Sequence, residues 1–118
     1  MASREYEDFV RDLFAEVPGT RQRRMFGGLG VFRDDLMFAL VADDVLYFKA
    51  DATTIPAFEA EGSGPFVYEG KKGAVTMSFW RAPERLFDEA EEFRAWADRA
   101  FEVALRAAAG KAPKRGKD

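Results

Sequence analysis

Apolar residues recur with two different periods along this chain, and the change of period divides it into helices and strands. In the first 17 residues they are spaced by three and four, which is typical of an amphipathic helix with one buried stripe. The stripe consists of Tyr6, Phe9, Val10, Leu13, Phe14 and Val17. Ser3 is a suitable N-cap for this helix, and Pro18-Gly19 ends it.

A strand-like pattern of apolar and aromatic residues follows and predicts strands at about 24–33, 36–42 and 45–50. Asp34-Asp35 and Asp43-Asp44 separate these strands. Aspartate adopts turn conformations less readily than glycine but better than most residues. The three strands therefore predict a β-meander.

A short helix and a hairpin are predicted after the meander. The helix is capped by Thr53 or Thr54 and ends near Gly62. The hairpin pairs strands at 66–69 and 74–80 across a loop bounded by glycines, of a length that hairpins use.

The C-terminal helix is predicted by a capping signal and a long apolar repeat. Asp88 and Glu91 have the spacing of a capping box. The residues that then recur with helical period are Phe93, Trp96, Ala97, Ala100, Phe101, Ala104 and Leu105. This helix is expected to end near Gly110.

The order of these elements, α-β-β-β-α-β-β-α, predicts an α+β domain. The natural arrangement is a two-layer sandwich, in which one antiparallel sheet of about five strands carries the helices on one face. At 118 residues the chain is long enough for one such domain and too short for two. We expect residues 1–110 to form the domain and residues 111–118 to form a basic disordered tail.

The charge of the chain is unevenly distributed. The tail holds Lys111, Lys114, Arg115 and Lys117 against Asp118, so a net charge of −3 for the whole chain leaves −6 on residues 1–110. An acidic body repels phosphate backbones, so nucleic-acid binding is expected to be weak. No cysteine, no apolar leader and no run of about 20 apolar residues is present, which predicts a cytoplasmic protein without a membrane segment.

Three glycines within four positions, Gly27, Gly28 and Gly30, interrupt an aromatic, strand-like run. Glycine in a strand indicates a bulge, a sharp bend or a close approach of another group. A bulged strand entry is the favoured interpretation. The alternative is a nest of backbone N–H groups that binds a small anion or ligand, although neither the Walker spacing nor the dinucleotide spacing of glycines occurs.

A basic segment leads directly into these glycines. Arg21, Arg23 and Arg24 come first, and Phe26 follows them. Arginine binds carboxylates or phosphates in a bidentate manner, so these residues, with the three glycines, are the candidate surface for a partner or an anion. Pairing of Arg23 and Arg24 with acidic residues of the first or last helix is the competing interpretation.

Candidates for catalysis are few, because the chain contains neither histidine nor cysteine. Asp34, Asp35, Asp43 and Asp44 would meet a hard cation only if their two loops were adjacent, and turn aspartates usually serve local backbone bonds. We therefore predict a non-enzymatic protein with no catalytic, cofactor-binding or metal-binding residues and with no cofactor.

Both faces of the predicted sheet are apolar, so one helix layer is not enough to cover them. In the strand at 45–50, Leu46 and Phe48 alternate with Val45 and Tyr47. A sheet with two apolar faces is typical of a second layer or a partner. A homodimer formed through the sheet and concealment by loops and the long helix are both compatible with the sequence.

Six blocks of sequence occur in a distinctive order within residues 4–108: 23–32 (Arg-Arg-Met-Phe-Gly-Gly-Leu-Gly-Val-Phe), 34–41, 46–51, 58–62, 65–68 and 77–80. In this order they resemble the N-terminal domain of the TfoX/Sxy family. The resemblance implies a fold similar to secretion-chaperone-like domains. Asp35 departs from the pattern, because the family usually has glycine there.

The resemblance also implies a regulatory role. Full-length members of the TfoX/Sxy family regulate natural competence with the cyclic AMP receptor protein, and they add a C-terminal helical domain. This sequence ends before that domain, so we expect a single-domain member that acts through a protein partner, with the transcription apparatus as the first candidate. The alternatives are a nucleic-acid-binding module that uses the arginines and the tail, and an anion binder at the glycine run.

Overall fold

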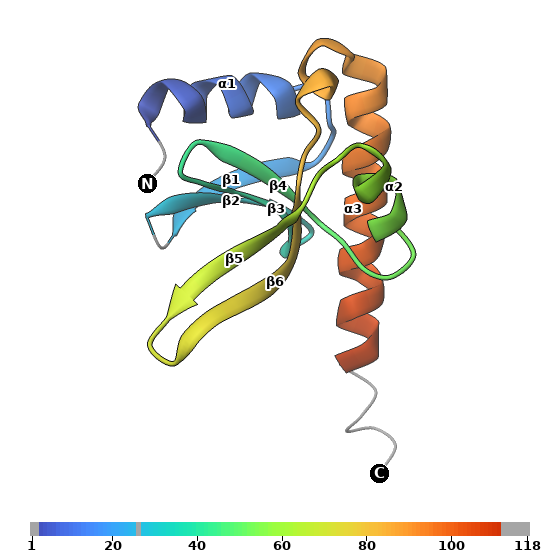
Figure 1. The fold of residues 1–118 in the computed structure, drawn as a ribbon. Coiled ribbons are helices and arrows are strands. Elements are labelled where there is room, and N and C mark those ends of the chain that lie inside the picture. Colours follow the sequence, from blue (N-terminus) through green and yellow to red (C-terminus); the bar gives the residue numbers. More distant parts are fainter. Residues whose placement is uncertain (1–2, 26, 112–118) are drawn as a thin grey trace.

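A computed structural model describes residues 3–25 and 27–111 of the chain (Figure 1). The helices are α1 (Arg4–Phe14), α2 (Ile55–Ala60), the 3₁₀ helix η1 (Glu84–Asp88) and α3 (Ala90–Lys111). The strands are β1 (Thr20–Met25), β2 (Gly28–Arg33), β3 (Leu36–Ala42), β4 (Val45–Lys49), β5 (Pro65–Gly70) and β6 (Gly73–Arg81). The predicted α+β class is confirmed.

The strands form one antiparallel sheet in the order β1-β2-β3-β4-β6-β5. It has six strands, one more than the sequence indicated. The predicted strand at 24–33 is in fact two strands, because the chain turns back between Met25 and Gly28, which are paired partners. The additional strand, β1, is polar and mostly exposed, so it lacks the apolar alternation by which strands are recognised.

The helices pack on one face of the sheet, as predicted, and together they enclose a single core. Phe14 of α1 lies 5.9 Å from Phe38 of β3 and 5.1 Å from Phe93 of α3, as measured between ring centroids. Phe38 also meets Phe101 at 5.8 Å. The rings meet edge to face, which is a favoured arrangement for aromatic pairs. None of the helices in the described residues is both long and apolar enough to cross a membrane.

The β5–β6 hairpin projects from the rest of the sheet as a two-stranded ribbon (Figure 1). The ladder between β4 and β6 covers only Tyr47 to Lys49, opposite Phe79 to Arg81. Among the described strands, β5 is therefore the only neighbour of the part of β6 nearest the hairpin loop. A two-stranded ribbon is marginally stable alone in water, so this part of the fold depends on contacts across its face.

The expected aspartate turns join β2 to β3 and β3 to β4. Asp34 and Asp35 have φ of 51° and 63°, and Asp43 and Asp44 have φ of 51° and 59°. Two successive positive φ values are the geometry of a type I′ turn, which matches the right-handed twist of the strands. The two turns lie at opposite ends of β3, so the four carboxylates do not come together as a cation site.

Two capping predictions differ from the structure. Asp88 closes η1 and α3 begins at Ala90, one residue further along than a capping box at Asp88 and Glu91 requires. Thr54 is the N-cap of α2, but its side chain makes no cap hydrogen bond. Its hydroxyl instead lies 3.1 Å from the backbone nitrogen of Asp51 and accepts a hydrogen bond from it. At the start of α2, the backbone carbonyl of Asp51 accepts hydrogen bonds from the backbone nitrogens of Thr54 and Ile55.

We expect Asp35→Gly to raise the free energy of unfolding by about 0.5–1 kcal/mol, because glycine adopts this left-handed conformation without a Cβ penalty. The ion pair that Asp35 makes with Arg21 is exposed, so its loss costs little. Chemical denaturation at fixed pH measures the change. Asp35→Ala is the control, because it removes the same ion pair while keeping a Cβ, and it should destabilise the protein. Equal stability of the two variants would contradict the prediction.

Candidate interaction surface on the open face of the sheet

The glycine run combines a turn with close packing, and the expected bulge is not there. Gly27 has a φ of 76° and completes the tight turn between β1 and β2. The β1–β2 register is regular through Gly28 and Gly30, and the irregularity of β2 falls later, between Val31 and Phe32. Gly28 and Gly30 are needed because a side chain would not fit at either position.

Contacts around Gly28 and Gly30 explain the missing side chains. A Cβ at Gly28 would collide with the backbone carbonyl of Val41. A Cβ at Gly30 would lie 2.7 Å from the Met25 sulfur and 2.9 Å from the Met37 sulfur. The bare backbone of β2 thus allows two methionine side chains to lie directly on the sheet. This confirms a close approach, which was the third interpretation of the sequence.

The three arginines of the basic segment point to opposite faces of the sheet, because alternate residues of a strand do so. Arg21 and Arg23 lie over the ring of Phe32, with their guanidinium carbons 5.9 Å and 5.1 Å from its centroid. Arg24 lies on the helix side, where it forms a 2.9 Å ion pair with Glu7 of α1. Phe26, which follows them in the sequence, lies outside the described residues.

Glu7 is a buried carboxylate in the contact between α1 and β1. Its residue is 1% exposed, and one oxygen, Oε1, pairs with Arg24. The other oxygen, Oε2, has no hydrogen-bond partner among the described residues. A buried charge is strongly destabilising without its partner. The pairing of an arginine with the first helix, an interpretation left open by the sequence, is therefore confirmed for Arg24.

The face of the sheet away from the helices carries a groove with a volume of about 630 Å³. Its walls come from the β1–β2 turn, from β3 and from the β5–β6 ribbon. Its lining includes apolar residues that are only partly buried: Met25, Met37, Leu40, Phe66 and Met77. We call this region the open-face groove. Its volume is within the range of typical ligand pockets, and its apolar lining is typical of binding sites.

The ribbon adds exposed apolar residues beside the open-face groove. Val67, Tyr68 and Val75 are 48%, 55% and 49% exposed. Tyr68 and Val75 are directly paired across the two strands, so they share one face of the ribbon. Val67 precedes Tyr68 in β5 and therefore faces the other side of the ribbon. Exposed apolar side chains that lie together, as Tyr68 and Val75 do, are characteristic of an interaction site.

Tyr47 of β4 supports the open-face groove from beneath the ribbon. Its ring centroid lies 4.8 Å from that of Phe66. Burial raises the pKa of the Tyr47 hydroxyl, and Asp43 raises it further, while Arg81 lowers it. Tyr47 is therefore neutral at physiological pH and remains able to donate a hydrogen bond.

The carboxylates with clearly lowered pKa values lie on the helix side, away from the open-face groove. Arg85 donates hydrogen bonds to both oxygens of Glu61 and of Glu92, at 2.7–3.0 Å. These bonds lower the pKa of both glutamates and raise the pKa of Arg85. The contribution of these pairs to stability is therefore present above the ordinary glutamate pKa and is lost as the pH falls through the lowered values. This network fastens α2 and η1 to α3.

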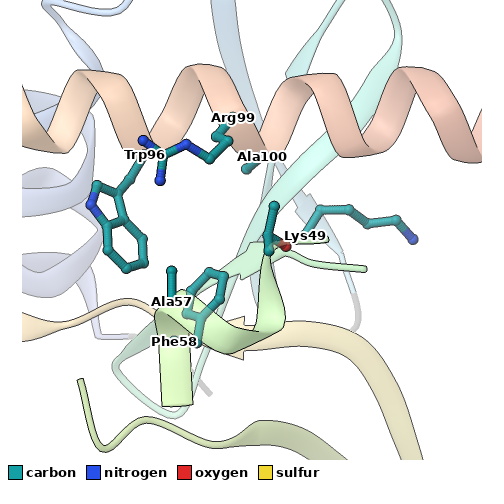
Figure 2. Close-up of a pocket in the computed structure, with 7 residues that line it drawn as sticks. Lys49, Ala57, Phe58, Trp96, Arg99 and Ala100 are labelled. Atoms are coloured by element: carbon teal, nitrogen blue, oxygen red, sulfur yellow. The ribbon is translucent and has the colours of Figure 1, made fainter. Parts of the chain in front are cut away.

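A second cavity, between α2, α3 and β4, is too small for a ligand (Figure 2). Its volume is about 10 Å³, which is room for one water molecule. Arg99 lies with its guanidinium carbon 5.8 Å from the Trp96 ring centroid, and Lys49 is directed away from Trp96 (Figure 2). Among residues 3–25 and 27–111, no three acidic side chains are placed to hold a metal ion.

The fold and the site together define an α+β domain with one helix-covered face and one open apolar face. Comparison with known sequences gives the family. The profile of the TfoX N-terminal domain matches residues 12–104, and the chain belongs to this family. The resemblance seen in the sequence is therefore confirmed.

The chain is similar to the DNA transformation protein TfoX1 of Aliivibrio fischeri (strain ATCC 700601 / ES114). The two sequences are 35% identical over 68 residues. The matched segment is 58% of this chain and 32% of the relative, so the chain spans about a third of the protein that it matches.

We expect alanine substitutions at the three glycines to differ in cost because the surroundings differ. Gly28→Ala should lower the free energy of unfolding most, by about 3 kcal/mol, since the collision is with backbone. Gly30→Ala should cost about 1–2 kcal/mol, because methionine side chains can move. Gly27→Ala should cost about 1 kcal/mol from backbone strain alone. Denaturant titrations measure the three values, and a Gly28→Ala variant as stable as the parent would contradict this account.

Arg24→Met should lower the free energy of unfolding by about 1–3 kcal/mol, because it leaves the buried Glu7 carboxylate without its partner. Arg21→Met on the same strand is the matched control, and it should change stability by less than about 0.5 kcal/mol because its ion pair is exposed. Restoration of stability in an Arg24→Met, Glu7→Leu double variant would identify the unpaired charge as the cause. Equal effects of the two single variants would show that the Glu7 pair does not stabilise the fold.

Proposed function

We propose that this chain is a non-enzymatic regulatory domain that acts by binding another protein through the open face of its sheet. The observation that carries the proposal is the open-face groove, with its partly buried methionines and the exposed Tyr68 and Val75 beside it. Interfaces are enriched in methionine and aromatic residues at their centres. The opposite face of the sheet, by contrast, packs against the helices and contributes Phe38 and Phe48 to the core.

The family supports a regulatory setting for this binding. The relative from Aliivibrio fischeri is named as a DNA transformation protein, and the matched segment includes part of the TfoX N-terminal domain. We propose that this chain acts in the same process, through a partner in the transcription apparatus. The chain spans about a third of that relative, so the proposed role is assigned to the TfoX N-terminal domain alone.

Two other functions have weaker support from the geometry. A nucleic-acid surface needs its cations on one side, whereas Arg24 faces α1 and Arg21 and Arg23 face the opposite side. An anion nest needs free backbone N–H groups, whereas Gly30 lies inside β2, which is paired with strands on both sides. The contacts of these three arginines therefore favour structural and cation–π roles.

Site-specific photo-crosslinking in the source organism tests the proposal. A benzophenone amino acid is placed at Tyr68, on the open face, and in a separate strain at Leu105, on α3. The two residues are matched because both are apolar and half exposed, at 55% and 46%. Irradiation should join the Tyr68 variant to a distinct protein that mass spectrometry identifies, and the Leu105 variant should not give that product.

Three other outcomes of the crosslinking experiment would contradict or change the proposal. Identical products from both positions, or no product from Tyr68, would overturn binding through the open face. A crosslink between two copies of this chain would replace the partner by a homodimer, which sedimentation at micromolar concentration would also detect.

A further inference from the structure

The chemistry of the open-face groove indicates what kind of partner it takes. We infer that the groove binds a protein segment that presents apolar side chains flanked by lysine or arginine. The inference rests on the proposed function, because it assumes that the open face is the binding surface. It goes further by assigning the charge and the polarity of the occupant.

The curvature of the sheet gives the groove a shape that suits a peptide segment of a partner. Met25 belongs to β1 and Tyr68 to β5, which are the two outermost strands in the sheet order, yet both line the same groove. The sheet therefore curls until its two ends face each other across the open face. Leu40 and Val41 of β3 lie between these walls. A peptide segment can lie along a groove that has a wall on each side, and such a groove suits it better than a flat surface would.

The groove lining is adaptable, and this favours apolar side chains of more than one shape. Three methionines line it: Met25, Met37 and Met77. Methionine side chains are flexible and polarizable, and they are frequent at surfaces that accept varied apolar segments. Gly30 allows Met25 and Met37 to lie low on the sheet, as the short distances to its absent Cβ indicate. A side chain there would raise the floor of the groove.

The charged residues among those that line the groove are both acidic. They are Asp43, in the turn after β3, and Glu69, on β5. Arg21 and Arg23 lie further along β1, over Phe32, and are not part of the lining. Carboxylates at the rim of an apolar groove attract lysine and arginine and repel acidic segments.

The charge of the whole domain acts in the same direction. Residues 1–110 carry a net charge of −6, which raises the local concentration of cationic segments and speeds their association. The same charge disfavours a second copy of this domain as the occupant, because two such bodies repel each other. A partner segment with basic flanks is therefore favoured over self-association.

Two synthetic amphipathic peptides test this inference on the full chain. They have identical leucine positions, and the polar positions are lysine in one and glutamate in the other. Fluorescence anisotropy of labelled peptides should give a dissociation constant about tenfold lower for the leucine–lysine peptide at low salt. This difference should shrink as salt is added, because rim charges are screened.

Two variants locate the binding and its charge dependence. Met77→Gln changes the groove wall without changing charge, and it should weaken both peptides by about tenfold or more. Glu69→Lys should weaken the leucine–lysine peptide by about threefold or more and strengthen the leucine–glutamate peptide. Glu102→Lys on α3 is the matched control, because it changes the net charge equally on the helix side, and its effect should be smaller. Thermal melts check that each variant is folded.

The outcomes separate this inference from the proposed function. Equal or tighter binding of the leucine–glutamate peptide, or equal effects of Glu69→Lys and Glu102→Lys, overturns the basic partner. Absence of binding by both peptides also overturns it, and a Tyr68 crosslink to a distinct protein would then still uphold binding through the open face. Binding that Met77→Gln leaves unchanged places the peptide outside the groove and overturns the inference.

Discussion

The ring of Phe14 joins the helix layer to the sheet. It meets Phe38 of β3 at 5.9 Å, Phe48 of β4 at 6.4 Å and Phe93 of α3 at 5.1 Å, as measured between centroids. Edge-to-face pairs of this kind contribute about 0.5–1.5 kcal/mol each beyond the area that they bury. Because the two strand partners of Phe14 lie on the same face of the sheet, α1 and α3 both pack on that face. The apolar residues of the opposite face are then left without a helix, and the open-face groove is a direct consequence of how the core is built.

Local pattern predicted the elements whose side chains are buried with a regular period. The helix around Phe14 and the strand containing Phe48 have such periods, and both are present. Strand β1 has no such pattern, because Thr20–Met25 is almost wholly polar and is held by backbone pairing with β2. An edge strand of this type leaves little trace in its own sequence. Asp35 was recognisable as a turn residue because aspartate is tolerated at positive φ, which depends on the residue alone.

The candidate site was predicted less completely, since it depends on contacts between distant residues. The sequence correctly marked Gly28 and Gly30 as positions that need bare backbone, but only the fold shows that Val41 is the obstacle at Gly28. The alternation around Tyr47 predicted that the face of the sheet away from the helices would also be apolar. It did not predict the groove, because the β5–β6 ribbon must curl towards the β1–β2 turn to form a wall, and no local signal encodes that long-range contact.

Strand β1 shows how one short segment serves both faces. The side chain of Arg24 points to the helix layer and neutralises Glu7, so it belongs to the stability of the fold. Its neighbour Arg23 points to the open face and lies over Phe32, outside the lining of the open-face groove. The basic run looked like one site in the sequence, but strand alternation divides its arginines between the two faces of the sheet. Substitutions on the open face of this domain can therefore leave the Arg24–Glu7 ion pair and the Phe14 cluster in place.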